Sequence, residues 1–221
     1  MMVAVPTETR PREQRVAMVP SEVSKLVGAG VAVTVQSGAG RQAGYRDEDY
    51  EEAGAAIAPD AAQALAAADV VTKVLAPTVD EAAMLPKGSA LVSFLTPTAD
   101  LETVRVLADR KVSAFSFDLV PRISRAQGMD ALSSQASVAG YRAVLVAAVT
   151  ISRFFPMVMT AAGTVPPARV LVMGAGVAGL QAIATARRLG GVVQAYDVRP
   201  EAAEEVRSLG ATFLDLGLEA A

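Results

Sequence analysis

Two residue types that often carry chemistry are missing, because the 221-residue chain contains no cysteine and no histidine. Without cysteine there are no disulfides and no thiol chemistry, a composition that fits the cytoplasm. Without histidine, any reaction must proceed without an imidazole acid, base or ligand. Since neither residue is available, we also expect no dense zinc site and no bound metal.

Long apolar runs and an excess of positive charge are lacking too. The longest apolar run, Ala143 to Val149, has seven residues, far below the about eighteen that a membrane-spanning helix needs. No charged region followed by an apolar stretch stands at the N-terminus, so we expect no secretory signal. The formal net charge is −3, without a basic stripe, which argues against nucleic acid as a partner.

What the chain does contain is a strand–loop–helix–strand pattern from Arg169 to Arg199. The apolar run Val170 to Met173 predicts a strand buried on both faces. A glycine loop of the form GxGxxG follows, and the helix after it ends at a glycine pair before a second strand. This βαβ pattern is the dinucleotide-binding fingerprint. The loop consists of Gly174, Ala175, Gly176, Val177, Ala178 and Gly179.

Each glycine of this loop has a separate physical role. Gly174 permits the tight turn out of the strand, and Gly176 lets a pyrophosphate approach the backbone. Gly179 lets the helix lie close to the strands. The helix begins at Val177 and Ala178, where unpaired N–H groups and the positive end of the dipole attract phosphate.

An acidic residue stands where the fingerprint requires one. Asp197 follows Gly179 by eighteen residues, at the end of the second strand, where a carboxylate accepts the hydroxyls of the adenine ribose. A carboxylate also repels a 2′-phosphate, so NAD is predicted in preference to NADP. Arg199 complicates this prediction, because an arginine at this place can bind a 2′-phosphate.

The remainder of the chain alternates strands with helices, and hydrophobic residues make up 52% of it. This pattern predicts an α/β fold with two Rossmann-like lobes, mainly parallel sheets and helices on both faces. A helical pattern from residue 129 to about 155 indicates a long connector. The predicted regions are an N-terminal lobe (1–128), a connector helix and loop (129–165) and a dinucleotide-binding domain (166–221).

The dinucleotide-binding domain contains one predicted βαβαβ half, whose third strand covers residues 211–214. A full dinucleotide-binding fold uses two such halves. We therefore expect the second lobe to be incomplete in this chain, and the chain to be a fragment.

Several segments resemble a known family. The N-terminal segments are ETRPREQRVAMVP (Glu8–Pro20), GYRDEDYEEAGA and DVVTKV. They resemble the shared N-terminal lobe of alanine dehydrogenases and proton-translocating NAD(P) transhydrogenases. The segment PRISRAQGMDALSSQASVAGYRAV (Pro121–Val144), with TAAGTVPPARVLVMGAGVAGLQAIATARRLG after it, is similar to the NAD(H)-binding component (domain I, alpha subunit) of the transhydrogenases. The resemblance covers essentially the whole chain.

The resemblance implies a second set of site residues, Arg122, Gln127, Asp130 and Ser133, around the nicotinamide end of bound NAD(H). Glutamine and serine can bond to a carboxamide or to ribose hydroxyls, and aspartate can accept from those hydroxyls. The alternative from spacing alone is that Asp130 caps the following helix and Arg122 is a solvated loop charge.

Alanine dehydrogenase is the alternative function within the same resemblance. In that family an arginine and a lysine hold the substrate and a histidine assists, and the matching positions are Arg15, Lys73 and Thr96. Because histidine is absent, the acid–base partner for amino acid chemistry is missing. Direct hydride transfer between two nicotinamides does not require one. We therefore interpret Arg15 and Lys73 as structural charges.

The resemblance then implies an oxidoreductase that binds NAD(H) and transfers hydride to NADP⁺ on a partner subunit. It implies a homodimer, an NADP(H)-binding subunit and membrane-spanning subunits that couple transfer to proton translocation. The expected location is cytoplasmic, peripheral on the inner face of the cell membrane through those partners.

Overall fold

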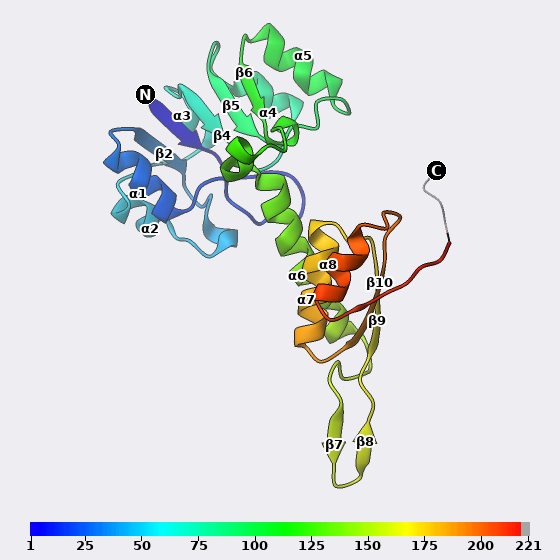
Figure 1. The fold of residues 1–221 in the computed structure, drawn as a ribbon. Coiled ribbons are helices and arrows are strands. Elements are labelled where there is room, and N and C mark those ends of the chain that lie inside the picture. Colours follow the sequence, from blue (N-terminus) through cyan, green and yellow to red (C-terminus); the bar gives the residue numbers. More distant parts are fainter. Residues whose placement is uncertain (218–221) are drawn as a thin grey trace. The chain divides into compact units, whose positions relative to one another are not determined.

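A computed structural model describes residues 1–217. The chain divides into two compact units, unit 1 (residues 1–129) and unit 2 (residues 130–221) (Figure 1). Both contain a parallel sheet with helices, so the predicted α/β class is confirmed.

Unit 1 is built on a six-stranded parallel sheet of order β3-β2-β1-β4-β5-β6. Its strands are β1 (Met2–Val5), β2 (Ala32–Gln36), β3 (Ala56–Ala58), β4 (Val70–Thr72), β5 (Ala90–Ser93) and β6 (Ser113–Ser116). Its α-helices are α1 (Pro20–Gly28), α2 (Asp47–Glu52), α3 (Ala61–Leu65), α4 (Val79–Met84) and α5 (Leu101–Asp109). The strand order reverses between β1 and β4, as in doubly wound folds.

Both faces of this sheet are covered, as the alternation along β1 shows. Val3 and Val5 belong to a core cluster that includes Val23 of α1. Ala4, between them, belongs to a second cluster that includes Leu107 of α5. Because successive residues of a strand point to opposite faces, helices must pack on both sides. The predicted arrangement of helices is confirmed.

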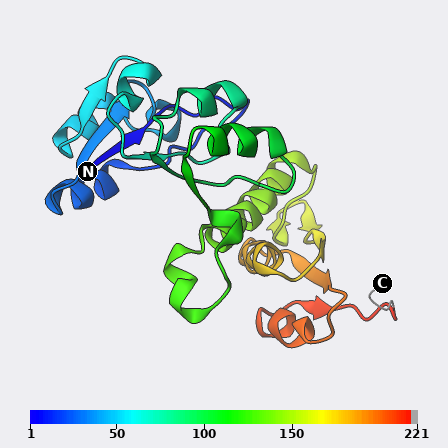
Figure 2. The same ribbon diagram turned by 90° about the horizontal axis from the view of Figure 1, so that it is seen from above.

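Unit 2 contains a three-stranded parallel sheet of order β11-β10-β9. Its elements are α6 (Ala131–Thr150), β7 (Val158–Thr160), β8 (Gly163–Val165), β9 (Arg169–Met173), α7 (Val177–Arg188), β10 (Val192–Tyr196), α8 (Ala202–Ser208) and β11 (Thr212–Phe213). Ile183 of α7 and Val206 of α8 are fully buried in its core. Figure 2 shows α6 and α7 side by side, as Figure 1 does.

The prediction that β9 is buried on both faces is wrong. Val170 and Val172 pack on the core of unit 2, but Leu171 and Met173 are 56% and 79% exposed. The core helices pack on one face of this sheet within the described residues. The apolar run therefore reflects a strand that is covered on one side in this chain.

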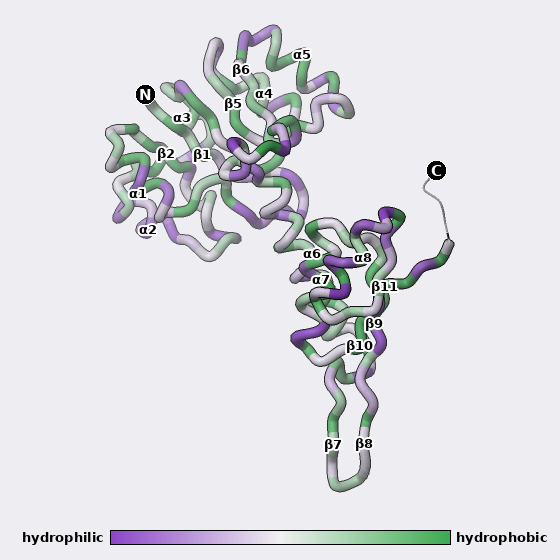
Figure 3. The backbone as a smooth tube through the Cα atoms, in the orientation of Figure 1, coloured by the Kyte–Doolittle hydropathy of each residue, from purple (hydrophilic) through white to green (hydrophobic). Residues whose placement is uncertain are grey.

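The predicted connector helix is shorter than expected, because α6 ends at Thr150 and Ile151 is already extended. The following segment, predicted as a loop, contains the antiparallel hairpin β7–β8. Figure 3 colours this hairpin from neutral to hydrophobic, and Met159 on it is 74% exposed. Among the helices of residues 1–217, none is both long and apolar enough to cross a membrane.

Candidate dinucleotide-binding site

The glycine loop between β9 and α7 has the geometry that its sequence predicts. Gly174 has a φ of +93°, a left-handed conformation that glycine adopts without strain. A Cβ on Gly179 would overlap the Gly174 carbonyl oxygen, so the third glycine is needed for close packing. A Cβ on Gly176 would meet no atom of the described residues within 4 Å. The loop is therefore tightly closed at Gly179 and open at Gly176, where a ligand can approach the backbone.

The start of α7 presents N–H groups that its own helix leaves unpaired. The first bond from one helical turn to the next joins Leu180 N–H to the Gly176 carbonyl at 2.8 Å. The N–H groups of Val177, Ala178 and Gly179 come before it, and the N-cap residue Gly176 has no side chain to accept from them. Such a helix start binds anions through its N–H groups and its dipole.

Asp197 closes the loop against the end of β10. Its carboxylate accepts the Ala175 N–H at 2.6 Å and the Arg199 N–H at 2.9 Å. The Arg199 guanidinium adds bonds from Nε at 3.0 Å and from Nη2 at 3.2 Å. These bonds, first those of the Arg199 side chain and then the two backbone N–H groups, hold the pKa of Asp197 well below its usual range. The carboxylate is therefore charged at neutral pH, as a ribose acceptor must be.

A cavity of about 280 Å³ lies beside Asp197 at the carboxyl ends of β10 and β11. Its walls include Val198, Arg207 and Phe213. Tyr196 also lines it, and the Tyr196 hydroxyl is buried without a hydrogen-bond partner among the described residues. Ligand sites in open α/β sheets lie at this edge. The open backbone at Gly176 and the unpaired Tyr196 hydroxyl together fit a dinucleotide.

The four residues assigned to the nicotinamide end are divided between the units. Arg122 and Gln127 are exposed residues of unit 1, the latter in the 3₁₀ segment Ser124–Met129. In unit 2, Asp130 is the N-cap of α6 and accepts from Ser133 N–H at 2.9 Å and from Ser133 Oγ at 2.7 Å. The structure therefore brings Asp130 and Ser133 together, in the capping arrangement that was the alternative. A cap and a ligand contact are compatible, and the nicotinamide assignment stays a prediction.

Helix α6 contacts the phosphate-binding turn of α7 directly. Gly140 lies so close that a Cβ there would overlap the Ala178 carbonyl oxygen. Ser133 precedes Gly140 by seven residues in the same helix, which is about 10 Å along its axis. That distance is shorter than an extended dinucleotide. Sequence reasoning missed Gly140, although a glycine inside an apolar helix is a signal of close packing.

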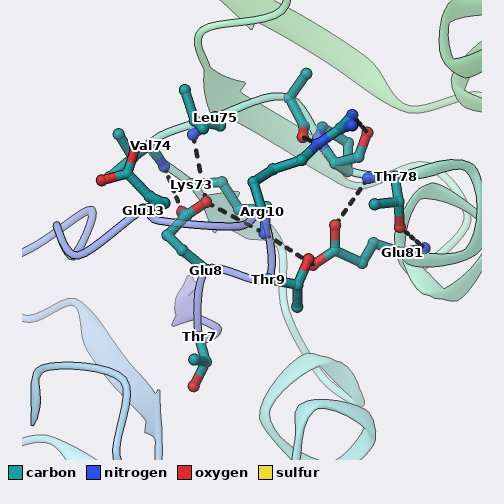
Figure 4. A network of polar contacts seen from close by, with 12 residues as sticks. Thr7, Glu8, Thr9, Arg10, Glu13, Lys73, Val74, Leu75, Thr78 and Glu81 are labelled. Carbon is teal, nitrogen blue, oxygen red and sulfur yellow. Dashed lines mark hydrogen bonds and ion pairs between the residues drawn. The ribbon is translucent and has the colours of Figure 1, made fainter. Parts of the chain in front are cut away.

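The charged residues of unit 1 form a separate network (Figure 4). The Lys73 amine, on a residue 3% exposed, lies 2.9 Å from Glu81 Oε1 and 3.5 Å from Glu8 Oε2. Glu8 also accepts the Val74 N–H at 2.6 Å, and Glu81 accepts the Thr9 hydroxyl at 3.0 Å. The network joins the segment after β1 to the segment after β4.

Burial raises the pKa of Glu81, but the Thr78 N–H and the Lys73 amine outweigh burial and lower it overall. Arg15 donates to Glu13 from Nε at 2.8 Å and from Nη2 at 2.6 Å. Thr96 has a φ of +44°, and its N–H donates to Asp118. Both Arg15 and Lys73 thus have carboxylate partners within unit 1. Within residues 1–217 no group of three or more acidic side chains could hold a metal ion.

Comparison with known proteins identifies the chain's relatives. Residues 4–139 match the model of the alanine dehydrogenase/PNT N-terminal domain, and residues 143–220 match that of the C-terminal domain. In Rhodospirillum rubrum, where the alpha subunit of NAD(P) transhydrogenase is named in separate pieces, the chain is 53% identical to the first piece, over 100% of this chain and 59% of the relative. It is 48% identical to NAD(P) transhydrogenase subunit alpha of Cereibacter sphaeroides, over 100% of this chain and 42% of that relative.

Two solved structures share the fold. A transhydrogenase from Sinorhizobium meliloti superimposes with a TM-score of 0.94 at 48% identity, over 97% of this chain and 64% of that one. An L-alanine dehydrogenase superimposes with a TM-score of 0.86 at 28% identity, over 97% of this chain and 60% of that one. The chain spans 59% of the length of its Rhodospirillum relative. On these matches, the chain belongs to the alanine dehydrogenase/PNT family.

Proposed function

We propose that the chain binds NAD(H) in unit 2 and transfers hydride between it and NADP(H) held on a partner polypeptide. The observation that carries this proposal is the glycine loop, open at Gly176, between a helix start that attracts phosphate and the charged Asp197. The transhydrogenase names of the relatives support the reaction class.

The choice of NAD(H) over NADP(H) follows from Asp197. Its carboxylate is 7% exposed and charged. Two ribose hydroxyls can donate to it, whereas a 2′-phosphate would place a second anion beside it. NADPH should therefore bind this chain more weakly than NADH.

For the transfer itself, the residues of this chain bind and orient. The nicotinamide ring, when bound, supplies or accepts the hydride. Gln127 and Ser133 are proposed to hold its carboxamide or ribose, Asp130 to accept from ribose hydroxyls, and Arg122 to orient them. Because hydride passes between two carbons, no protein group has to exchange a proton. A site without histidine is sufficient for this reaction.

The partners follow from the relatives, which are alpha subunits and so work with other subunits. We propose an NADP(H)-binding subunit, membrane-spanning subunits that couple transfer to proton translocation, and a homodimer of this chain. The chain would then lie on the cytoplasmic face of the membrane as a peripheral component. Unit 2 supports the division of labour, because it offers one dinucleotide fingerprint for two nucleotides.

The test begins with titration of the purified chain with NADH and NADPH, followed by a transfer assay with an NADP(H)-binding partner. We expect NADH to bind more tightly than NADPH, and hydride to pass only when the partner is added. Sustained NADH formation from L-alanine and NAD⁺ would instead indicate an alanine dehydrogenase. Binding without transfer, even with the partner, would indicate a nucleotide-binding module.

A further inference from the structure

The Asp197 carboxylate is already saturated with donors. Oδ1 accepts from Arg199 N and Arg199 Nε, at 2.9 and 3.0 Å. Oδ2 accepts from Ala175 N and Arg199 Nη2, at 2.6 and 3.2 Å. A carboxylate offers about four lone-pair positions. A ribose can therefore bind to Asp197 only if a donor leaves.

Two of the four donors are backbone N–H groups, one in the glycine loop and one directly after β10. Moving either would disturb the chain that forms the site. The other two donors belong to the Arg199 guanidinium, whose side chain is 60% exposed, against 7% for Asp197. An exposed ion pair contributes little stability, and its arginine remains solvated when it leaves. The guanidinium is therefore the donor that can be displaced.

We propose that Arg199 is a gate on the adenosine side of the site, displaced from Asp197 when an adenine ribose binds. The numbers of donors match, because the guanidinium contributes two N–H groups and an adenine ribose has two free hydroxyls. A nucleotide with a 2′-phosphate offers one hydroxyl and adds a negative charge, so it cannot replace both bonds. Arg199 would thus strengthen the selection of NAD(H). This inference rests on the proposed binding of NAD(H) by unit 2.

The gate has a consequence of unusual sign, since removing an arginine from the site should tighten binding. Without the guanidinium, Asp197 keeps its two backbone donors and has two positions ready for the ribose. The free chain should become less stable, because a nearly buried carboxylate loses partners. Affinity and stability should therefore change in opposite directions.

The experiment is calorimetric titration of the whole chain with NADH, AMP and 2′-deoxy-AMP. Arg199→Met should tighten NADH and AMP about two- to five-fold, and 2′-deoxy-AMP by a smaller factor. Its unfolding midpoint without ligand should fall. Arg199→Lys, which has one charged group instead of a fork, should give intermediate values. The matched control is Arg207→Met, which removes a positive charge from the same cavity without touching Asp197, and which should not tighten either ligand.

Weaker or unchanged binding of NADH and AMP by Arg199→Met would overturn the gate alone, because the guanidinium would then be a ligand contact or a bystander. If the wild-type chain bound neither NADH nor AMP, both the gate and the proposed function would be wrong. Tightening by Arg199→Met and Arg207→Met alike would also overturn the gate, since charge removal alone would explain it.

Discussion

Asp197 performs two tasks in unit 2, because it holds the glycine loop through Ala175 N–H and offers the carboxylate for a ribose. Asp197→Asn keeps the shape but removes the charge. We expect NADH and AMP to bind about ten- to hundred-fold more weakly, since charged hydrogen bonds contribute about 1.5–3 kcal/mol each. Titration with both ligands checks this, because a loss confined to NADH would place Asp197 away from the adenosine.

Asp197 should also make stability depend on pH. Its pKa in the folded chain lies below the value of about 3.9 in an unfolded chain. Such a group stabilises the fold fully above the unfolded pKa, and this contribution is lost as pH falls through the folded pKa. The free energy of unfolding in urea should therefore differ between wild type and Asp197→Asn at pH 6, and the gap should narrow below about pH 4. A gap that stays constant down to pH 3.5 would contradict the shifted pKa.

Asp130 allows a test that separates capping from ligand contact, because unit 1 contains the same cap. Asp100 accepts from Thr103 N–H at 3.1 Å and Thr103 Oγ1 at 2.9 Å. Both Asp130→Asn and Asp100→Asn should lower stability by about 0.5–2 kcal/mol through the cap. Asp130→Asn alone should slow hydride transfer, and by more than it weakens NADH binding. Equal transfer rates in the two variants would leave Asp130 as a cap only.

At the scale of elements, the contact of α6 with α7 is the feature most sensitive to a single methyl group. Gly140→Ala would force α6 away from the Ala178 carbonyl, at a cost of about 1–3 kcal/mol. Gly28→Ala is a suitable control, because a Cβ at Gly28 meets nothing within 4 Å. Urea unfolding should show the loss in Gly140→Ala only. Because the displaced turn binds phosphate, NADH affinity should fall as well.

Elements with a strong local signal can be predicted from the sequence. The alternation in β1, the Asp100 cap of α5 and the whole βαβ unit from β9 to β10 are set by neighbouring residues. The third strand, β3, escapes prediction because Ala56–Ala58 is too short to show a period. The hairpin β7–β8 lies almost fully exposed, so no buried face marks it in the sequence.

Side-chain partners cannot be predicted in the same way, because they depend on contacts far apart in the chain. Asp197 is expected for its distance from Gly179, but its bond to Ala175 N–H follows from the fold of the loop. Lys73 is recognisable as a charge, while its burial between Glu8 and Glu81 joins segments more than sixty residues apart. The exposure of Leu171 shows the converse, since an apolar run does not say which of its faces is covered.

The molecule as a whole has separate cores in its two units, whereas the predicted nicotinamide residues are divided between the units. NADH can contact all four only by engaging both units. AMP carries the adenosine half and should reach the Asp197 side alone. The two ligands therefore distinguish the two ends of the predicted site.

Hydrogen exchange measured along the chain turns this into a test. Both ligands should slow exchange at the start of α7 and at residues 197–199, where N–H groups become covered. NADH alone should also protect residues 122–133. At one hundred times its dissociation constant, NADH stabilises the form that binds it by about 2.7 kcal/mol, enough to slow exchange through unfolding of unit 2 about a hundred-fold. Protection of unit 2 without residues 122–127 would mean that Arg122 and Gln127 do not contact the cofactor, and that unit 2 alone recognises NADH.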